Sequence, residues 1–292
     1  MPLQSLLDLP APAKLNLFLH VTGRRPDGYH LLQSVFVLID WADTLHVELR
    51  RDSRLQRHDL GPALPPEDLA LRAARALQQA TGCTLGADIS VLKQVPWGAG
   101  MGGGSSDAAT VLLALNRLWG LRLPRARLLE LAAPLGADVP FFIGGENAFV
   151  EGIGEILTPI EWAPRRYAVV KPAESVATPS IFSHPDLARN TEAATVAGSV
   201  AHMSTEPPEA GRVAYGHNDL QPVAEALCPP IAQVASWLEG RYGNSRMTGS
   251  GSAVFAAVGA EGATWSEGEL PAGWVGRMCR SLAGHPLRDW AG

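Results

Sequence analysis

The chain has 292 residues, of which 46% are hydrophobic and 18% are charged, so it can bury a core and is not a disordered chain. Its net charge of −5 excludes the strongly basic balance of a non-specific nucleic-acid binder. Three widely spaced cysteines exclude a disulfide framework and a thiolate zinc site. The sequence has no signal-peptide pattern and no apolar run of about 18–20 residues. We therefore expect a soluble, cytoplasmic protein that binds neither membranes nor nucleic acid.

The first predicted element is a strand over residues 13–22, where apolar and other side chains alternate. This alternation puts Lys14 and Asn16 on the same face of the strand. The next segments predict a turn at 24–28, strands at 34–40 and 44–50 with a short turn between them, and an amphipathic helix at 67–81 that ends at Gly82.

The middle of the chain predicts a strand over 87–93, a glycine-rich loop and then a helix over 105–119, which begins with Ser105-Ser106-Asp107. Later segments predict a helix after Pro124, a strand at 167–171, a loose surface segment at 190–213, helices at 219–227 and 229–240, and a strand–glycine turn–strand unit at 246–258. This layout predicts an α+β protein with two domains, over residues 1–158 and 159–292.

The strongest functional signal is the loop Pro96-Trp97-Gly98-Ala99-Gly100-Met101-Gly102-Gly103-Gly104-Ser105-Ser106. Glycines let a backbone approach a ligand closely and turn its N–H groups inward. The helix that follows offers an electropositive N-terminus, and the two serines add hydroxyls that can reach phosphate or Mg²⁺. The loop therefore predicts a polyphosphate-binding site, and a glycine-rich tight turn is the structural alternative.

Three other kinds of phosphate-binding loop each need residues that this sequence lacks. A Walker A loop needs lysine before its Ser or Thr, but Gly104 precedes Ser105 here. Gly98, Gly100 and Gly103 match a dinucleotide-binding fingerprint, yet residues 108–129 lack the acidic residue that such a site needs. The H-R-D and D-F-G strings of protein kinases are also missing from the sequence.

The loop and its helix, PWGAGMGGGSSDAATVLLALN, resemble the second motif of the GHMP kinases, which phosphorylate small molecules of galactose, homoserine and mevalonate type. Two further strings, PAKLNLFLHVTGRRPDGYHLLQSVF and RMTGSGSAVFAAV, resemble the branch of that family that phosphorylates 4-diphosphocytidyl-2-C-methyl-D-erythritol. The resemblance runs from about residue 10 to residue 290. It implies a two-domain GHMP kinase fold with the active site in the cleft between the domains.

The resemblance also implies a reaction. The family transfers the γ-phosphoryl group of ATP to the tertiary 2-hydroxyl of its substrate, in the non-mevalonate route to isoprenoid precursors. Lys14 and Asp138 match the catalytic pair, with Asp138 as general base and Lys14 orienting and polarising. From the residues alone, Asp138 reads equally well as a helix N-cap, and Lys14 reads as a lysine at a strand edge.

The same resemblance implies a cytidine site. Tyr29 would stack on the cytosine, His30 would bind its edge, and Phe182 would cover its other face, with Thr178 close to the substrate. Asn16 would touch the substrate near the reacting hydroxyl. The structural alternative is that Tyr29 and Phe182 are core aromatic residues.

A second loop, at 248–252, matches the third GHMP motif, so Gly249 and Ser250 would close on the phosphates and substrate; a plain hairpin turn is its alternative. Lys93 would lie near the adenine or be a solvated strand-end lysine. The implied cofactors are ATP and Mg²⁺, with the metal ligands unknown. We expect a small-molecule substrate and a monomer or weak dimer. The competing functions are phosphorylation of another alcohol, nucleotide binding without catalysis, and, more distantly, a Rossmann oxidoreductase.

Overall fold

The structure is a computed structural model of the chain, and it describes residues 3–198, 216–259, 265 and 267–291. Its first layer is a six-stranded sheet in the order β3-β4-β2-β5-β6, with β1 paired to β2. Only the β3–β4 pair is parallel. The strands are β1 (Ser5–Arg24), β2 (His30–Arg50), β3 (Leu55–Asp59), β4 (Gly86–Leu92), β5 (Ala148–Glu151) and β6 (Ile156–Pro159).

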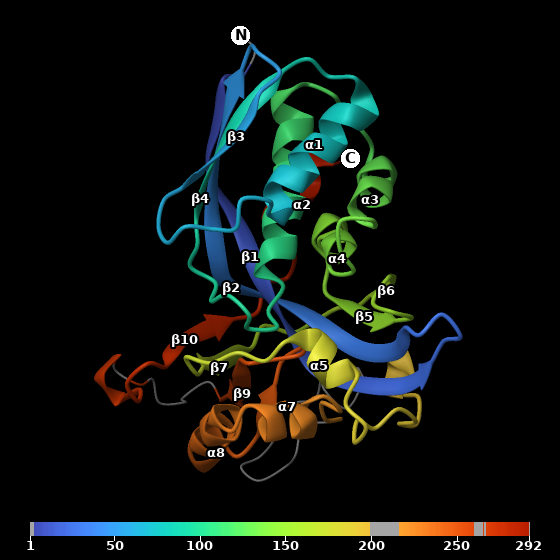
Figure 1. Cartoon of the computed structure of the whole chain (residues 1–292), viewed down its shortest axis with the longest axis vertical. Coiled ribbons are helices and arrows are strands. Elements are labelled where there is room, and N and C mark those ends of the chain that lie inside the picture. Colours follow the sequence, from blue (N-terminus) through green and yellow to red (C-terminus); the bar gives the residue numbers. More distant parts are fainter. Residues whose placement is uncertain (1–2, 199–215, 260–264, 266, 292) are drawn as a thin grey trace.

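Four helices cover one face of this sheet (Figure 1). They are α1 (Leu69–Thr81), α2 (Gly103–Leu118), α3 (Arg125–Ala132) and α4 (Val139–Gly144). The predicted helix at 67–81 is confirmed: the Asp68 carboxylate caps it by accepting from the Leu71 amide at 2.9 Å, and Gly82 ends it with a φ of +63°. Helix α2 begins at Gly103, earlier than predicted, because its first turn is entered through the backbone of Gly102 rather than a serine cap.

The second layer is a four-stranded antiparallel sheet in the order β10-β7-β9-β8 (Figure 1). Its strands are β7 (Arg166–Lys171), β8 (Ser245–Met247), β9 (Val254–Val258) and β10 (Val275–Arg280), accompanied by helices α5 (Thr178–Phe182), α7 (Gln221–Leu227) and α8 (Pro230–Tyr242) and by a short 3₁₀ turn, Glu267–Glu269. A second short 3₁₀ turn, Arg288–Trp290, contacts α2 of the first layer. The strand at 167–171, the helices at 219–227 and 229–240 and the strand–turn–strand unit at 246–258 are thus confirmed, within a few residues at their ends. The predicted loose segment at 190–213 lies largely outside the described residues.

One strand prediction is wrong. The segments 34–40 and 44–50 are not separate strands, because β2 runs unbroken through the residues predicted as a turn. The Trp41 indole is buried and donates to the Gln94 carbonyl at 2.7 Å, and the Asp43 carboxylate is buried against the chain that follows β4. These long-range contacts satisfy the polar groups of residues that resemble a turn in the local sequence, so the strand can continue through them.

The two layers meet around the middle of β1 and β2. A shared core joins residues of these strands, such as Leu15 and Val37, to Tyr167 and Phe255 of the second sheet. The last residues return to the first layer, where Arg125 donates to the Ala291 carbonyl at 2.9 Å. The division of the chain at residues 158 and 159 stays a prediction.

Candidate active site

The glycine loop lies where β4 ends and α2 begins. Gly98, Gly100 and Gly102 have φ values of +64°, +71° and +70°, a left-handed backbone that residues with side chains rarely adopt. Helix α2 has no side-chain cap at Gly102, so its first amide groups are not satisfied by a capping side chain. This arrangement leaves an electropositive helix end beside an open backbone, which suits a phosphate group.

A cavity of about 380 Å³ opens against this loop. Residues 64–72 form its other wall, and Trp97 is 61% exposed at its edge. Of the residues predicted to bind ATP, all but Ser106 line the cavity: Lys93, Pro96, Trp97, Gly98, Ala99, Gly100, Met101, Gly102, Gly103, Gly104 and Ser105. The Ser106 side chain is instead fully buried in the first turn of α2. Of the two serines, only Ser105 therefore faces the cavity in which a ligand can lie.

The glycine loop and the predicted second loop are in direct backbone contact. The amides of Ser252 and Ala253 donate to the carbonyls of Gly98 and Ala99 at 3.0 and 3.2 Å. A Cβ atom on Gly100 would lie 2.3 Å from the Thr248 carbonyl oxygen, and one on Gly249 would lie 2.6 Å from the Gly100 carbonyl oxygen. Glycine is thus required at both positions because the two backbones touch, which a plain hairpin turn would not demand.

Lys14 and Asp138 face each other, with the Lys14 Nζ 3.5 Å from an Asp138 carboxylate oxygen. Lys14 also donates to the side-chain amide oxygen (Oδ1) of Asn16 and lies 4.1 Å from the centre of the Phe36 ring. Burial lowers the pKa of Lys14, and the Asp138 carboxylate opposes part of that shift. The ammonium therefore keeps a carboxylate partner, as its buried position on a strand requires.

The same geometry separates the two roles considered for Asp138. It stands at the N-cap position of α4, but its side chain makes no capping hydrogen bond within the described residues. Its carboxylate is 28% exposed and faces a second cavity, of about 260 Å³. A carboxylate that is paired with a lysine and open to a cavity is available to accept a proton from a ligand.

This second cavity gathers most of the residues predicted to bind the acceptor: Lys14, Asn16, Asp138, Thr178, Phe182, Gly249 and Ser250. The hydroxyls of Thr178 and Ser250 are 2.7 Å apart. Gly100 and Gly102 line this cavity and the first one. The glycine loop is consequently the wall between the first cavity, lined by the predicted ATP-binding residues, and the second, lined by predicted acceptor-binding residues; we term them the nucleotide cavity and the acceptor cavity.

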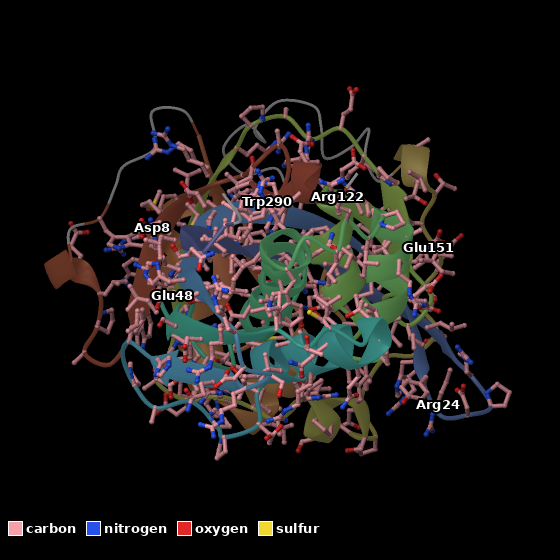
Figure 2. All side chains as sticks on the ribbon, turned by 90° about the horizontal axis from the view of Figure 1, so that it is seen from above. Asp8, Arg24, Glu48, Arg122, Glu151 and Trp290 are labelled. Atoms are coloured by element: carbon pink, nitrogen blue, oxygen red, sulfur yellow. The ribbon has the colours of Figure 1, made fainter. Side chains whose placement is uncertain are left out.

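The predicted cytidine residues are brought together only in part. The rings of His30 and Phe182 have centroids 5.0 Å apart, and Phe182 is partly buried. Tyr29 is 60% exposed and makes no ring contact with any other described residue. Tyr29 is therefore not a core aromatic residue. It lies in the turn between β1 and β2, on the hairpin that carries Arg24 outward in Figure 2.

Lys93 is not a solvated strand-end residue. Its ammonium is mostly buried, pairs with Asp43 and lies 2.7 Å from an Asp107 carboxylate oxygen. Burial alone would lower the pKa of Lys93, but Asp107 and Asp43 outweigh it and raise that pKa. Burial, together with the nearby Asp43 charge, raises the pKa of Asp107 to about 7 even though Lys93 opposes the shift.

Sequence reasoning missed Asp43, which lies within the segment that was predicted as a turn. Its buried carboxylate accepts from the amides of Gln94 and Val95 at 2.6 and 2.8 Å, just before the glycine loop. A signal was nevertheless present in the sequence. The chain has only three lysines among 24 basic residues, so Lys93 itself pointed to a required ammonium and hence to carboxylate partners.

Within the described residues, no cluster of three or more His, Cys, Asp or Glu side chains is arranged to hold a metal ion. None of the helices that the structure describes is long and apolar enough to cross a membrane.

Comparison with known proteins defines the class. The model of the GHMP kinase N-terminal domain matches residues 68–146, and that of the C-terminal domain matches residues 204–266. A homoserine kinase from Cytophaga hutchinsonii has a similar fold at 17% identity, with a TM-score of 0.66 over 97% of this chain and 96% of that one. These matches give the chain the fold of the GHMP kinases, a class of ATP-dependent small-molecule kinases.

Nearer relatives define the branch. A 4-diphosphocytidyl-2-C-methyl-D-erythritol kinase from Methylibium petroleiphilum is 62% identical over the full length of both chains. One from Polaromonas naphthalenivorans is 56% identical over 99% of this chain and 97% of its own. A crystal structure of 4-(cytidine 5'-diphospho)-2C-methyl-D-erythritol kinase is 35% identical, with a TM-score of 0.75 over 94% of this chain and 99% of that one. The chain belongs to the 4-diphosphocytidyl-2-C-methyl-D-erythritol kinase family of the GHMP kinases.

Proposed function

We propose that this enzyme transfers the γ-phosphoryl group of ATP to the 2-hydroxyl of 4-diphosphocytidyl-2-C-methyl-D-erythritol, giving the 2-phosphate and ADP in the non-mevalonate isoprenoid pathway. The observation that carries the proposal is the acceptor cavity. It has the Lys14–Asp138 pair on its wall together with Phe182, an aromatic residue that suits a base, and it shares the glycine loop with the nucleotide cavity. We also propose that the enzyme is a cytoplasmic monomer or weak dimer.

The chemistry follows from the positions of the side chains. Phosphoryl transfer depends mainly on holding the donor, the acceptor and the developing charge in place. Asp138 accepts the proton of the 2-hydroxyl as that oxygen attacks the γ-phosphorus. Lys14 keeps the carboxylate and the hydroxyl aligned, while Asn16 holds the lysine from the other side. The open backbone of the glycine loop binds the phosphate oxygens.

Mg²⁺ supplies charge neutralisation at the β- and γ-phosphates when ATP is bound. The described residues fit an ion of this kind, which keeps several waters and needs few protein ligands. Of the two serines in the loop, Ser105 is the one whose hydroxyl would hold the ion, because Ser105 lines the nucleotide cavity while the Ser106 hydroxyl is buried and has no hydrogen-bond partner among the described residues.

The test is an ADP-release assay with Mg-ATP and three acceptors: 4-diphosphocytidyl-2-C-methyl-D-erythritol, homoserine and mevalonate. Turnover with the cytidine compound alone is the expected result, and the position of the new phosphate is read by ³¹P–¹H NMR of the product. Turnover with another alcohol would retain the phosphate loop and the Lys14–Asp138 pair but overturn the cytidine site. No turnover with any acceptor would overturn the proposed reaction.

A further inference from the structure

Arg189 bonds the backbone of Phe182, which lines the acceptor cavity, and every N–H of its guanidinium is used. Its Nε is 3.2 Å from the Nε2 atom of His30. The two terminal nitrogens donate to four backbone carbonyls, one in the last residue of α5 and three in the segment after it: those of Phe182 at 3.1 Å, His184 at 2.7 Å, Pro185 at 3.4 Å and Leu187 at 2.9 Å. A guanidinium has five N–H donors and no acceptor, and the four N–H groups on the terminal nitrogens are already bonded to carbonyls. The N–H on Nε is therefore the one that faces His30.

This contact fixes the protonation of the imidazole. Arginine stays charged in proteins, so the His30 Nε2 atom must accept the hydrogen bond, and the proton of the neutral ring must lie on Nδ1. Burial and the charges of Arg189 and Arg24 lower the pKa of His30, which keeps the ring neutral near pH 7. Within the described part of the chain, no residue accepts a hydrogen bond from His30 Nδ1. His30 therefore offers a ligand a donor rather than an acceptor.

The Phe182 ring lines the acceptor cavity and lies against His30, which is not itself among the lining residues, so a base stacked on Phe182 would bring its edge toward the imidazole. Stacking on an aromatic ring accepts any base, so discrimination has to come from the hydrogen bonds at the base edge. The N3 atom of cytosine accepts a hydrogen bond, whereas N3 of uracil carries a proton and donates one. A fixed N–H at this edge pairs with cytosine and opposes uracil.

We propose that Arg189 is a positioning residue for base selection: it locks His30 in the Nδ1–H form, so that the enzyme takes a cytidine rather than a uridine diphosphate substrate. This inference rests on the proposed function and deepens it. Arg189 itself contacts the protein and not the base. Its guanidinium also ties the end of α5, which carries Phe182, to the hairpin that carries His30, so both parts of the base site are held by one side chain.

The first measurement is the tautomer of His30 in the full-length enzyme, read from its ¹⁵N imidazole shifts with His30→Gln used for assignment. The expected result is a protonated Nδ1 and an unprotonated Nε2 near pH 7. Replacing Arg189 with Met should bring protonated Nε2 into the equilibrium. A wild-type ring that is protonated on Nε2 would overturn the inference.

The second measurement is the affinity for CMP and UMP by calorimetry. One good base contact discriminates by about 1–3 kcal/mol, so we expect CMP to bind about tenfold or more tightly than UMP. Arg189→Met and His30→Gln should reduce this ratio to about threefold or less. Arg24→Met is the matched control: it removes a cation near His30 whose side chain, among the described residues, bonds only the Gly28 carbonyl, and it should leave the ratio unchanged.

Two outcomes separate this inference from the proposed function. If Arg189→Met weakens CMP and UMP equally, Arg189 only supports the loop, and the inference is overturned while the kinase assignment stands. If Arg189→Met does not fold, His30→Gln and the wild-type tautomer still decide the question. If wild-type enzyme binds neither nucleotide and does not turn over the cytidine substrate, the proposed function fails first, and the inference falls with it.

Discussion

The two sides of the site are built in different ways. The nucleotide cavity is lined by two stretches of chain, 64–72 and 93–107, and the second of these presents mainly backbone. The acceptor cavity is lined by side chains from segments as far apart as Lys14, Asp138, Thr178 and Ser250. Phosphate is bound by dipoles that any backbone carries, whereas an acceptor hydroxyl needs particular side chains at particular angles.

This difference predicts which property of the enzyme a substitution on each side of the site will affect. A backbone cradle depends on glycine conformation and on the charges beneath it, so we expect changes there to affect stability and binding. A side-chain site depends on individual functional groups, so we expect changes there to affect turnover with little effect on folding. The four predictions below test this division, from the largest expected effect to the smallest.

The largest effect is expected from Asp138→Asn on the acceptor side. The amide cannot take the hydroxyl proton, so kcat should fall by about 10²- to 10⁴-fold, the usual contribution of a general base. ADP binding should change by no more than about twofold, because Asp138 does not line the nucleotide cavity. Single-turnover kinetics and calorimetry measure the two quantities separately.

The control for this variant is Asp289→Asn, since the side chain of Asp289 is 90% exposed and lies away from both cavities. It should retain wild-type turnover. Full activity in Asp138→Asn would show that the hydroxyl proton leaves by another route, and the proposed role of Asp138 would be rejected.

The comparison also explains how far the sequence could be read. The glycine loop was recognisable because its residues are contiguous, and a backbone that must adopt left-handed conformations needs several glycines close together in the sequence. The neighbouring elements were predictable for the same local reason: Asp68 and Gly82 delimit α1 at the residues where capping chemistry places its ends. The resemblance to GHMP kinases then supplied Lys14 and Asp138, whose separation of more than a hundred residues no local pattern could bridge.

What escaped prediction depends on contacts between distant segments. Asp43 looked like a turn residue because its partners, Lys93 and the amide of Val95, lie about fifty residues later. Arg189 attracted no prediction because its link to His30 joins residues 159 positions apart. In both cases the polar side chain is satisfied only in the folded state, so its local sequence gives no hint of burial.

On the nucleotide side, Lys93→Met should lower stability. The variant leaves the carboxylates of Asp43 and Asp107 buried without their shared cation, and breaking a buried pair in this way costs about 3–5 kcal/mol. Urea unfolding should show a lower midpoint, and ADP should bind more weakly because Lys93 lines the cavity. Adding Asp107→Asn should restore part of the loss. An unchanged midpoint in the single variant would mean that the cluster does not support the loop.

A smaller effect is expected from Gly100→Ala, which tests the wall shared by the two cavities. Its Cβ would meet the Thr248 carbonyl and the backbone would have to keep a φ of +71°, a strain of about 1–3 kcal/mol. Because Gly100 lines both cavities, kcat/KM should fall about tenfold for ATP and for the acceptor alike. In the matched control, Gly240→Ala in α8, no atom of the described residues beyond the local helix backbone lies within 4 Å of the added Cβ, so both values should stay unchanged. A loss confined to ATP would show that the loop does not serve both sides.

The smallest effect is a shift in the pH dependence of turnover, set by Lys14. Burial lowers its pKa below 10.5, so the ammonium is present below that lowered pKa and is lost as the pH rises through it. We expect kcat/KM to decline on the alkaline side at a pH lower than an ordinary lysine would give, measured from about pH 7 to 10. Lys14→Arg should be slower at every pH but should lack this decline, because a guanidinium stays charged. Lys171→Arg, at the other buried lysine with a lowered pKa, should leave the decline in place. If the decline persists in Lys14→Arg, another group controls it, and the charge on Lys14 is not what sets the alkaline limit of the acceptor side.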